Sequence, residues 1–513
     1  MTLTSLARKA LLFVLIAAGL YGVLAFSFTA CLKINYPYMV NLGEPPLSQA
    51  IHSVLKGKIP YRELSSPPYS LVPYGPVYLY LAVFLSRLPG LSSGWAGAPF
   101  VVGRLLTLAS TFLAAGFIYL ILRKDKVRRI FAVIPALFFI SHPYVMRWGV
   151  QVNVDMMGVS LALTSFYFLW CHVLEDQKDR RQVALGIFLS VIAFFTKSSM
   201  IACPAAFFWF LVFQRKFKKA AVFFLLMGVL TGTIYFWLNH WTHGAYFFHT
   251  TYEIGKRHFF PIFIGRFWLL SARQAPLLVA SSLFGLAGLV RGGKRSFAFL
   301  YLFFVLLMTV TLGKQGSDTN YFLEWLALSS LTLGWMLESF AGLPEGPQRS
   351  FFRPWVASVV VGFFLCQIVA WIYPYRDLSR VTHGYKASKD FFDRISLIVQ
   401  RTKGKILSAD MSLLTANDRE IFYEPFPMGQ MSYSGVWDER LILKELDEKN
   451  IALIILFFYA PPLKADRNFT IAFMDMFKKR YEFVGRAVPP PDMDPDLGGH
   501  TLFFYVPKKD ASL

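Results

Sequence analysis

Long apolar runs separated by short polar stretches dominate the first 375 residues. At 1.5 Å per residue, an apolar helix of about 18 residues or more can cross a bilayer. With shorter runs allowed inside a bundle, the pattern predicts about eleven membrane spans. They are Ala10–Leu32, Phe100–Leu122, Ile130–Val145, Val154–Leu174, Val183–Phe195, Ser199–Phe213, Ala220–Leu238, Gln274–Val290, Phe297–Leu312, Tyr321–Phe340 and Trp355–Tyr373. The predicted fold is mainly α, a polytopic helical membrane bundle.

Basic clusters between these runs set the orientation, because short cytoplasmic loops collect Lys and Arg. If the spans alternate, all of the clusters fall on one side. The clusters are Arg8–Lys9, Arg123–Arg129, Lys178–Arg181, Arg215–Lys219, Arg291–Arg295 and Arg349–Arg353. We therefore expect a multi-pass protein of the cell (inner) membrane with a cytoplasmic N-terminus. The loop after the first span and the C-terminal tail are then outside.

The tail from about Arg376 changes character and mixes short strand-like and helix-like segments. The expected strands are Lys405–Asp410, Ile421–Phe426, Ile451–Tyr459, Tyr481–Val488 and Thr501–Val506, and the expected helices are Ala387–Thr402, Trp437–Glu448 and Ile471–Arg480. The chain thus divides into a membrane part, residues 1–375, and a small α/β domain, residues 376–513, that is periplasmic or extracellular.

The first outer loop contains two helix-like pieces. Pro46–Leu55 is amphipathic and ends before Gly57, and Pro76–Leu88 is apolar but too short to span. Several prolines stiffen the connection between them. We expect two helices lying in the membrane interface, with Glu44 directly before the first. Glu44 is either a functional carboxylate or a favourable charge at the helix start.

Composition supports a membrane protein: 55% of residues are hydrophobic, 17% aromatic and only 16% charged. The net charge of +21 is spread over short clusters between apolar runs, which excludes a soluble nucleic-acid-binding face. The four cysteines have no paired spacing, so neither a disulfide framework nor a zinc site is indicated.

Several polar and charged residues lie near the outer ends of the spans, where membrane charges usually face a cavity or a partner. They are Arg104, Arg147, Asp155, Lys197, Lys314, Asp318 and Asn320, with Glu324 close by. The alternative is that some of them reach the interface or pair with one another. As a set on one side, they are expected to converge on the Glu44 loop.

The order of motifs resembles the GT-C class of membrane glycosyltransferases, in particular the bacterial protein-mannosyltransferase-like and aminoarabinose-transferase-like enzymes. The matching elements are Glu44, Gly57–Tyr61, Tyr74–Tyr78, Gly103–Arg104, Asn153–Asp155, Thr196–Lys197 and Lys314–Glu324. The resemblance implies inverting transfer of a sugar from a polyprenyl-phosphate carrier to a lipid, glycan or protein acceptor at the outer membrane face. Relatives carry an Asp, often Asp-Glu, in this loop. Here Gly43 precedes Glu44, which leaves the need for a divalent metal ion open.

Within that reaction, a carboxylate serves as general base and cations stabilise the departing phosphate. Glu44 is the expected base, and Asp155 is a second catalytic candidate that orients a cation, binds sugar hydroxyls or helps to hold a divalent ion. Phosphate binding is assigned to Lys197, Arg104, Arg147 and Lys314, and sugar or acceptor binding to Asn153, Asn320, Tyr321 and Tyr61.

Other classes of protein remain. A multispanning transporter or flippase would use Asp155 and Lys197 in a solute or proton pathway, but would be expected to show internal repeats, which are not evident. A polymerase or ligase of surface polysaccharide would share the lipid-linked donor, and a membrane-tethered sensor would not need so many spans.

Overall fold

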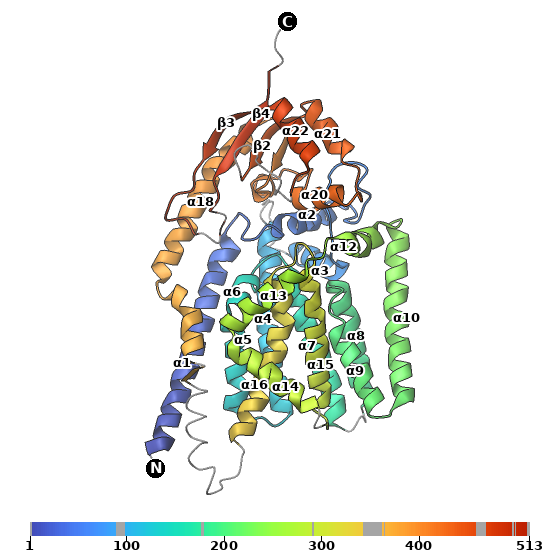
Figure 1. Ribbon diagram of the computed structural model, residues 1–513, viewed down its shortest axis with the longest axis vertical. Helices are drawn as coiled ribbons and strands as arrows, with labels where there is room; N and C mark the ends of the chain where they lie inside the picture. The colour runs from blue at the N-terminus through green and yellow to red at the C-terminus, as the bar shows by residue number, and fades with distance from the viewer. Residues whose placement is uncertain are drawn as a thin grey trace.

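The computed structural model has a helical bundle at one end and a small α/β domain at the other (Figure 1). It describes residues 3–88, 98–175, 179–289, 292–341, 362–363, 365–457, 468–494, 497 and 499–509. The N-terminus lies at the end of the bundle remote from the α/β domain.

The bundle is built from apolar helices that follow the predicted spans in chain order, as far as Ala341. Its longer helices are α1 (Leu3–Asn35), α4 (Ala98–Lys124), α5 (Arg129–Ser141), α7 (Asp155–Leu174), α8 (Arg180–Thr196), α9 (Ala202–Phe213), α10 (Phe217–Trp241), α13 (Pro261–Gln274), α14 (Pro276–Leu289), α15 (Ser296–Met308) and α16 (Leu323–Ala341). The connections contain α6 (Pro143–Trp148), α11 (Ala245–Phe247), η1 (Phe248–Tyr252), α12 (Glu253–Lys256), η2 (Thr309–Gly313), η3 (Thr319–Phe322) and η4 (Tyr373–Tyr375).

Five helical segments of the described chain are long and apolar enough to cross a membrane by themselves: Leu12–Asn35, Pro99–Lys124, Asp155–Leu174, Phe217–Trp241 and Ser296–Gly313. The pair α13 and α14 adds a sixth if the two helices form one broken span. The count of about eleven spans therefore stays a prediction. Part of the last expected span, Trp355–Tyr373, lies outside the described residues (355–361 and 364), as do the basic positions Lys178, Arg291 and Arg349–Arg353.

Helix α13 was not predicted from the sequence. It is joined to α14 through Ala275 with a bend of 107°. Arg266 and Arg273 interrupt its apolar pattern, and Pro276 cannot continue the backbone hydrogen bonding of the preceding helix. The sharp bend thus has a local cause in the sequence.

A mixed four-stranded sheet forms the centre of the C-terminal domain. Its strands are β1 (Lys405–Ser408), β2 (Ile451–Leu456), β3 (Tyr481–Ala487) and β4 (Leu502–Pro507), in the order β1-β2-β4-β3. β1 and β2 are parallel, and the other two pairs are antiparallel. Helix α18 (Leu378–Arg401) contributes to one apolar cluster beside the sheet, and α21 (Arg440–Asp447) and α22 (Ile471–Arg480) to another.

Four of the five expected strands are confirmed over most of their length, with the end of Ile451–Tyr459 beyond Phe457 outside the described residues. The expected strand Ile421–Phe426 is wrong. Only Tyr423 forms an isolated bridge, to Tyr69, and α20 (Pro425–Tyr433) begins at once. Proline at a first helical position starts a helix readily and cannot donate to a sheet. The short α19 (Ser412–Thr415) completes the domain.

The two predicted helices of the first outer loop are confirmed as α2 (Glu44–Leu55) and α3 (Pro76–Ser86). The expected position of α2 and α3 in the membrane interface stays a prediction, but α2 is not a surface helix of the protein. All of its residues from Glu44 to Ile51 are buried, because the C-terminal domain covers it while α3 and α4 support it. The loop beyond α2 also enters the core of the C-terminal domain, through Leu64, Tyr69 and Leu71.

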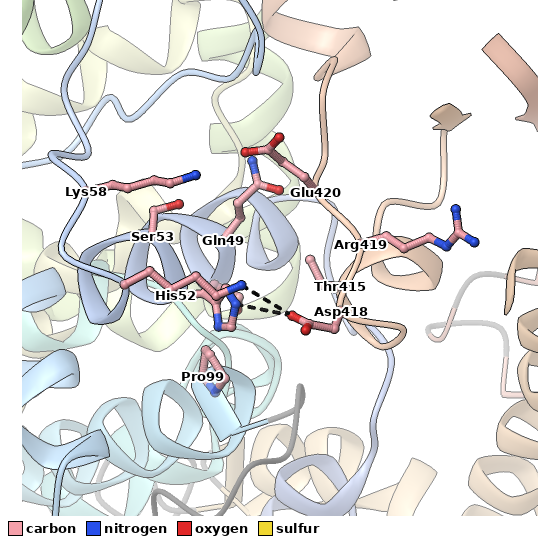
Figure 2. Close-up of a pocket in the computed structure, with 11 residues that line it drawn as sticks. Gln49, His52, Ser53, Lys58, Pro99, Thr415, Asp418, Arg419 and Glu420 are labelled. Carbon is pink, nitrogen blue, oxygen red and sulfur yellow. Dashed lines mark ion pairs between the residues drawn. The ribbon is translucent and has the colours of Figure 1, made fainter. Parts of the chain in front are cut away.

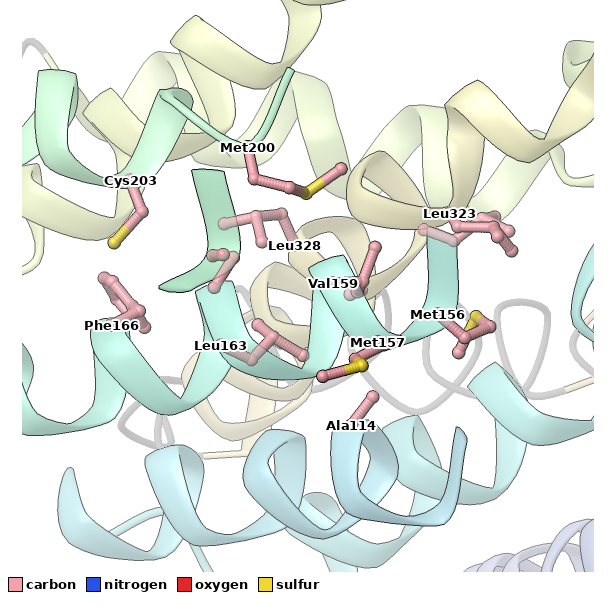
Figure 3. Packing of buried hydrophobic residues seen from close by; sticks show 14 of the residues in the cluster. Ala114, Met156, Met157, Val159, Leu163, Phe166, Met200, Cys203, Leu323 and Leu328 are labelled. Atoms are coloured by element: carbon pink, nitrogen blue, oxygen red, sulfur yellow. The ribbon is translucent and has the colours of Figure 1, made fainter. Parts of the chain in front are cut away.

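Methionine side chains pack closely around the start of α7, beside the residues of the candidate functional site. Met156 and Met157 follow Asp155 on this helix, and Met200 follows the end of α8 (Figure 3). All three side chains are buried in the main apolar cluster. Their packing places the first turn of α7 next to the turn that carries Lys197.

Candidate functional site

Glu44 and Arg104 form a buried ion pair between α2 and α4. Arg104 Nε donates to Glu44 Oε1 at 3.0 Å and Arg104 Nη2 donates to Oε2 at 2.8 Å. The backbone N–H groups of Val152 and Val40 donate to the same two oxygens, at 2.8 and 2.7 Å. The side chains of Glu44 and Arg104 are 1% and 0% exposed.

The remaining donors of Arg104 are also used inside the protein, by the carbonyl oxygens of Lys33, Tyr36 and Tyr38. A carboxylate with four donors already in place has no oxygen free for an acceptor hydroxyl, and a saturated guanidinium has no donor free for a phosphate. This geometry argues against the roles of general base for Glu44 and phosphate ligand for Arg104. It makes them a structural pair that joins α1, α2, α4 and the segment before α7.

Asp155 and Lys197 form a second pair, between the start of α7 and the end of α8. Lys197 Nζ donates to Asp155 Oδ1, and Asn320 Nδ2 donates to Oδ2 at 3.0 Å. Lys197 Nζ lies 4.1 Å from the centre of the Tyr321 ring. The structure thus brings together four predicted site residues, from three separate motifs.

Glycines allow the backbones around this pair to approach. A Cβ at Gly75 would lie 1.9 Å from the Phe195 carbonyl oxygen, so the turn before α3 rests directly on the end of α8. A Cβ at Gly158 would lie 3.1 Å from Met200 Cγ, where the Lys197 turn packs on α7. These contacts explain why glycine stands in the Tyr74–Tyr78 motif and after Asp155.

Glu44 is connected to this cluster indirectly. The hydrogen bond from Val152 to Glu44 fixes the backbone three residues before Asp155, and Asn153 Oδ1 accepts from the Asp155 N–H at 3.1 Å. Asn153, predicted to bind sugar, therefore orients the first turn of α7. Glu44 and Asp155, which were expected to converge, are thus connected through the backbone of residues 152–155.

Two further charged residues face the cluster and were not predicted. Arg257 forms a two-pronged pair with Glu253, at 2.9 and 3.0 Å, and interacts electrostatically with Tyr321 and Tyr74. Tyr74 in turn interacts with both Asp155 and Lys197. The spacing of Glu253 and Arg257 by four residues, typical of a helical ion pair, was the available signal.

The other predicted residues have different surroundings. Arg147 pairs with Asp318 at 3.2 Å in a half-exposed position, and Lys314 Nζ approaches the Ile254 carbonyl oxygen at 3.5 Å. The buried Tyr61 hydroxyl donates to the Tyr74 carbonyl oxygen at 2.8 Å, so Tyr61 supports the turn before α3. Glu324, buried in the bundle, accepts from the Tyr301 hydroxyl at 2.6 Å.

The residues that the structure describes include no group of three or more His, Cys, Asp or Glu side chains placed to hold a metal ion. The divalent ion considered from the sequence therefore has no preformed carboxylate set among them and stays an open prediction.

A pocket of about 250 Å³ lies between α2 and the C-terminal domain (Figure 2). Asp418 lies 3.2 Å from His52 Nε2 and 3.9 Å from Lys56 Nζ, and both side chains come from α2 or its end. Gln49 also bonds to the backbone of Ile421. These contacts fasten α2 to the C-terminal domain, so we treat the pocket as part of this junction.

The architecture matches solved structures over almost the whole chain. The structure of ArnT from Cupriavidus metallidurans bound to undecaprenyl phosphate matches with a TM-score of 0.56 and 12% identity, over 96% of this chain and 97% of that one. Its apo form matches with a TM-score of 0.55 and 13% identity, over 97% and 98%. The fold is that of a GT-C class glycosyltransferase.

The archaeal oligosaccharyltransferase AglB from Archaeoglobus fulgidus, in complex with an inhibitory peptide and a dolichol-phosphate, is a further GT-C neighbour. It matches with a TM-score of 0.50 and 15% identity, over 88% of this chain and 69% of that one. Residues 92–254 match a family model described as a domain of unknown function, DUF8201. No curated protein matches the sequence.

Proposed function

We propose that this GT-C protein transfers a sugar from a polyprenyl-phosphate carrier to an acceptor at the outer face of the membrane, with inversion at the anomeric carbon. The supporting observation is the match along almost the whole length to ArnT, whose structure is described as bound to undecaprenyl phosphate. The Asp155–Lys197 cluster supplies charged and aromatic groups at one end of that fold.

The arrangement of charges supports the orientation. The basic turn from Arg123 to Arg129 and the turn from Arg215 to Lys219 lie at the end of the bundle opposite the C-terminal domain. Positively charged loops favour the cytoplasm. The C-terminal domain and the Asp155–Lys197 cluster are then on the outer side, as we expected from the sequence.

Lys197 is the residue to which we assign the leaving phosphate. An ammonium has three N–H donors, of which Asp155 uses one, and the side chain is almost buried. A fixed cation in such a site stabilises the negative charge that develops on the phosphate as the glycosidic bond breaks. Tyr321 and Asn320, beside it, offer a ring face and an amide to a sugar.

The test is to follow release of polyprenyl phosphate from labelled polyprenyl-phosphate hexose, N-acetylhexosamine and pentose donors by the purified protein in detergent. Lys197→Met is expected to lower turnover by roughly 100-fold or more, the scale for losing one preorganised electrostatic group. Lys478→Met, at an exposed position of α22, is the matched control and is expected to leave turnover unchanged.

Loss of Lys197 also leaves Asp155 buried without its partner, which by itself destabilises the fold. The double variant Lys197→Met with Asp155→Asn removes that unpaired charge. If the double variant regains both stability and turnover, Lys197 has only a structural role. If the wild type releases no polyprenyl phosphate from any donor but moves donor across the membrane of proteoliposomes, the protein is a flippase.

A further inference from the structure

A segment of the C-terminal domain is paired along the first outer loop. Tyr69 N donates to the Phe422 carbonyl oxygen at 2.7 Å, and Glu424 N donates to the Tyr69 carbonyl oxygen at 2.9 Å. This short extended ladder ends at Pro425, where α20 begins. The backbone of Glu424 is therefore fixed between this pairing and the start of α20, at the boundary between the bundle and the C-terminal domain.

The side chain of Glu424 is anchored through one oxygen only. Oε2 accepts from Leu71 N at 2.9 Å and from Ser70 Oγ at 3.1 Å. Within the described part of the chain, Oε1 takes no hydrogen bond. Glu424 thus has what Glu44 lacks, a carboxylate oxygen that is free to accept a proton.

Glu424 and the Asp155–Lys197 cluster share Arg257 as a neighbour, because Arg257 also interacts electrostatically with Tyr321 and Tyr74. Glu424 interacts electrostatically with Arg257, which attracts its negative form, and with Glu253, which repels it. Burial, the largest effect, raises the pKa of Glu424 to about 7. Such a carboxyl group is close to half ionised at neutral pH, the range in which a general base is most effective.

Contacts of Gly316 connect the segment that carries Glu424 to the Asp155–Lys197 cluster. A Cβ at Gly316 would lie 3.1 Å from the ring of Phe426 and 3.4 Å from Arg257 Nη1. Gly316 lies four residues before Asn320, which bonds to Asp155. The segment that carries Glu424 therefore covers the same turn that brings Asn320 to the Asp155–Lys197 pair.

We propose that Glu424, supplied by the C-terminal domain, is the general base of the sugar transfer, which rests on the proposed function above. In this step the acceptor oxygen attacks the anomeric carbon and its proton moves to Glu424 Oε1. The bond between the anomeric carbon and the phosphate oxygen breaks, and the polyprenyl phosphate leaves with the electron pair. Solvent then takes the proton from Glu424 before the next turnover.

The test compares Glu424→Gln with wild type, using a polyprenyl-phosphate-linked donor that the wild type has been shown to consume. Glutamine can keep the hydrogen bonds from Leu71 and Ser70 through its carbonyl oxygen but cannot take a proton. We expect kcat to fall by 100-fold or more, with KM for the donor within about 3-fold, since a general base typically contributes a factor of 10² to 10⁴. Glu482→Gln, exposed on β3, is the matched control.

The pH dependence separates a base from a positioning residue. Wild-type kcat is expected to rise with pH through an apparent pKa near 7, and Glu424→Gln is expected to lose this rise. Glu424→Asp, which shortens the reach but restores a base, is expected to recover part of the rate and the pH dependence.

A Glu424→Gln variant with kcat within 3-fold of wild type and an unchanged pH profile would overturn the proposal while leaving the transferase function intact. A Glu424→Gln variant that keeps the wild-type pH profile but has a higher KM for the donor would show that Glu424 only positions the loop. That result would also overturn the proposal. A wild-type protein that is inactive on every donor would overturn the proposed function, and the base assignment with it.

Discussion

The Glu44–Arg104 pair makes a sharp prediction about the substitution Glu44→Gln. Each oxygen of Glu44 accepts two hydrogen bonds. Whichever way the glutamine amide is turned, its NH₂ group would meet two of the four donors, and the charge of Arg104 would lose its counterion. Breaking a buried ion pair by removing one partner costs about 3 to 5 kcal/mol.

The cost is measurable as thermal stability. At about 2 °C per kcal/mol, the lower end for larger domains, this predicts an apparent Tm that falls by roughly 6 to 10 °C. Unfolding of a membrane protein in detergent is expected to be irreversible, so wild type and variant are compared at one heating rate, together with their inactivation half-lives at one temperature. Glu482→Gln on β3 is again the matched control.

A double variant checks the cause of the loss. If Glu44→Gln destabilises through the unpaired charge of Arg104, then Arg104→Gln in the same chain should cost less than the sum of the two single substitutions. Donor turnover, measured well below the unfolding temperature, should remain within about 10-fold of wild type. A Glu44→Gln protein that melts within 2 °C of wild type but has lost turnover by more than 100-fold would refute the reasoning and restore Glu44 as the base.

Two other positions give predictions of different kinds. Gly75→Ala is expected to lower both Tm and turnover, because its Cβ would overlap the Phe195 carbonyl oxygen; Gly228→Ala on α10, where a Cβ meets nothing within 4 Å, should do neither. His249 accepts from Val72 N at 3.0 Å, and burial lowers its pKa to about 4. Its contribution to stability is complete above pH 6.5 and decreases by about 3 kcal/mol as pH falls to 4. Unfolding followed against pH should lose much of its slope in this interval in His249→Gln, and an unchanged slope would contradict the assignment.

The sequence was informative about elements whose signal is local. Apolar runs predicted the longer bundle helices through Ala341 except α13, and α22 has the bounds that were expected, Ile471–Arg480. Placing charged span ends on one side of the membrane put Asp155 and Lys197 into one expected group, and the two side chains are in contact. Each of these predictions depends on the periodicity of apolar residues or on which side of the membrane the charges fall, and both can be read from one sequence.

Contacts between distant segments were the part that the sequence could not provide. Nothing local distinguishes a carboxylate with two free oxygens from one that four donors saturate, so the hydrogen bonds around Glu44 could not be predicted from the sequence. Glu424 belongs to a segment that was taken for a strand, and its partners Ser70 and Leu71 are more than 350 residues away. Its environment exists only after the chain has folded.

That separation has a consequence for how the protein is made. At 5 to 20 residues per second, the ribosome needs roughly 20 to 70 s to extend the chain from Leu71 to Glu424. During this interval the Tyr69–Leu71 segment lacks its partner segment, Phe422–Glu424, and α2 is not yet covered by the C-terminal domain. A nascent chain already anchored by its early spans therefore lacks the Glu424 carboxylate. If Glu424 is the base, a chain truncated before that residue would be inserted but would not consume lipid-linked sugar.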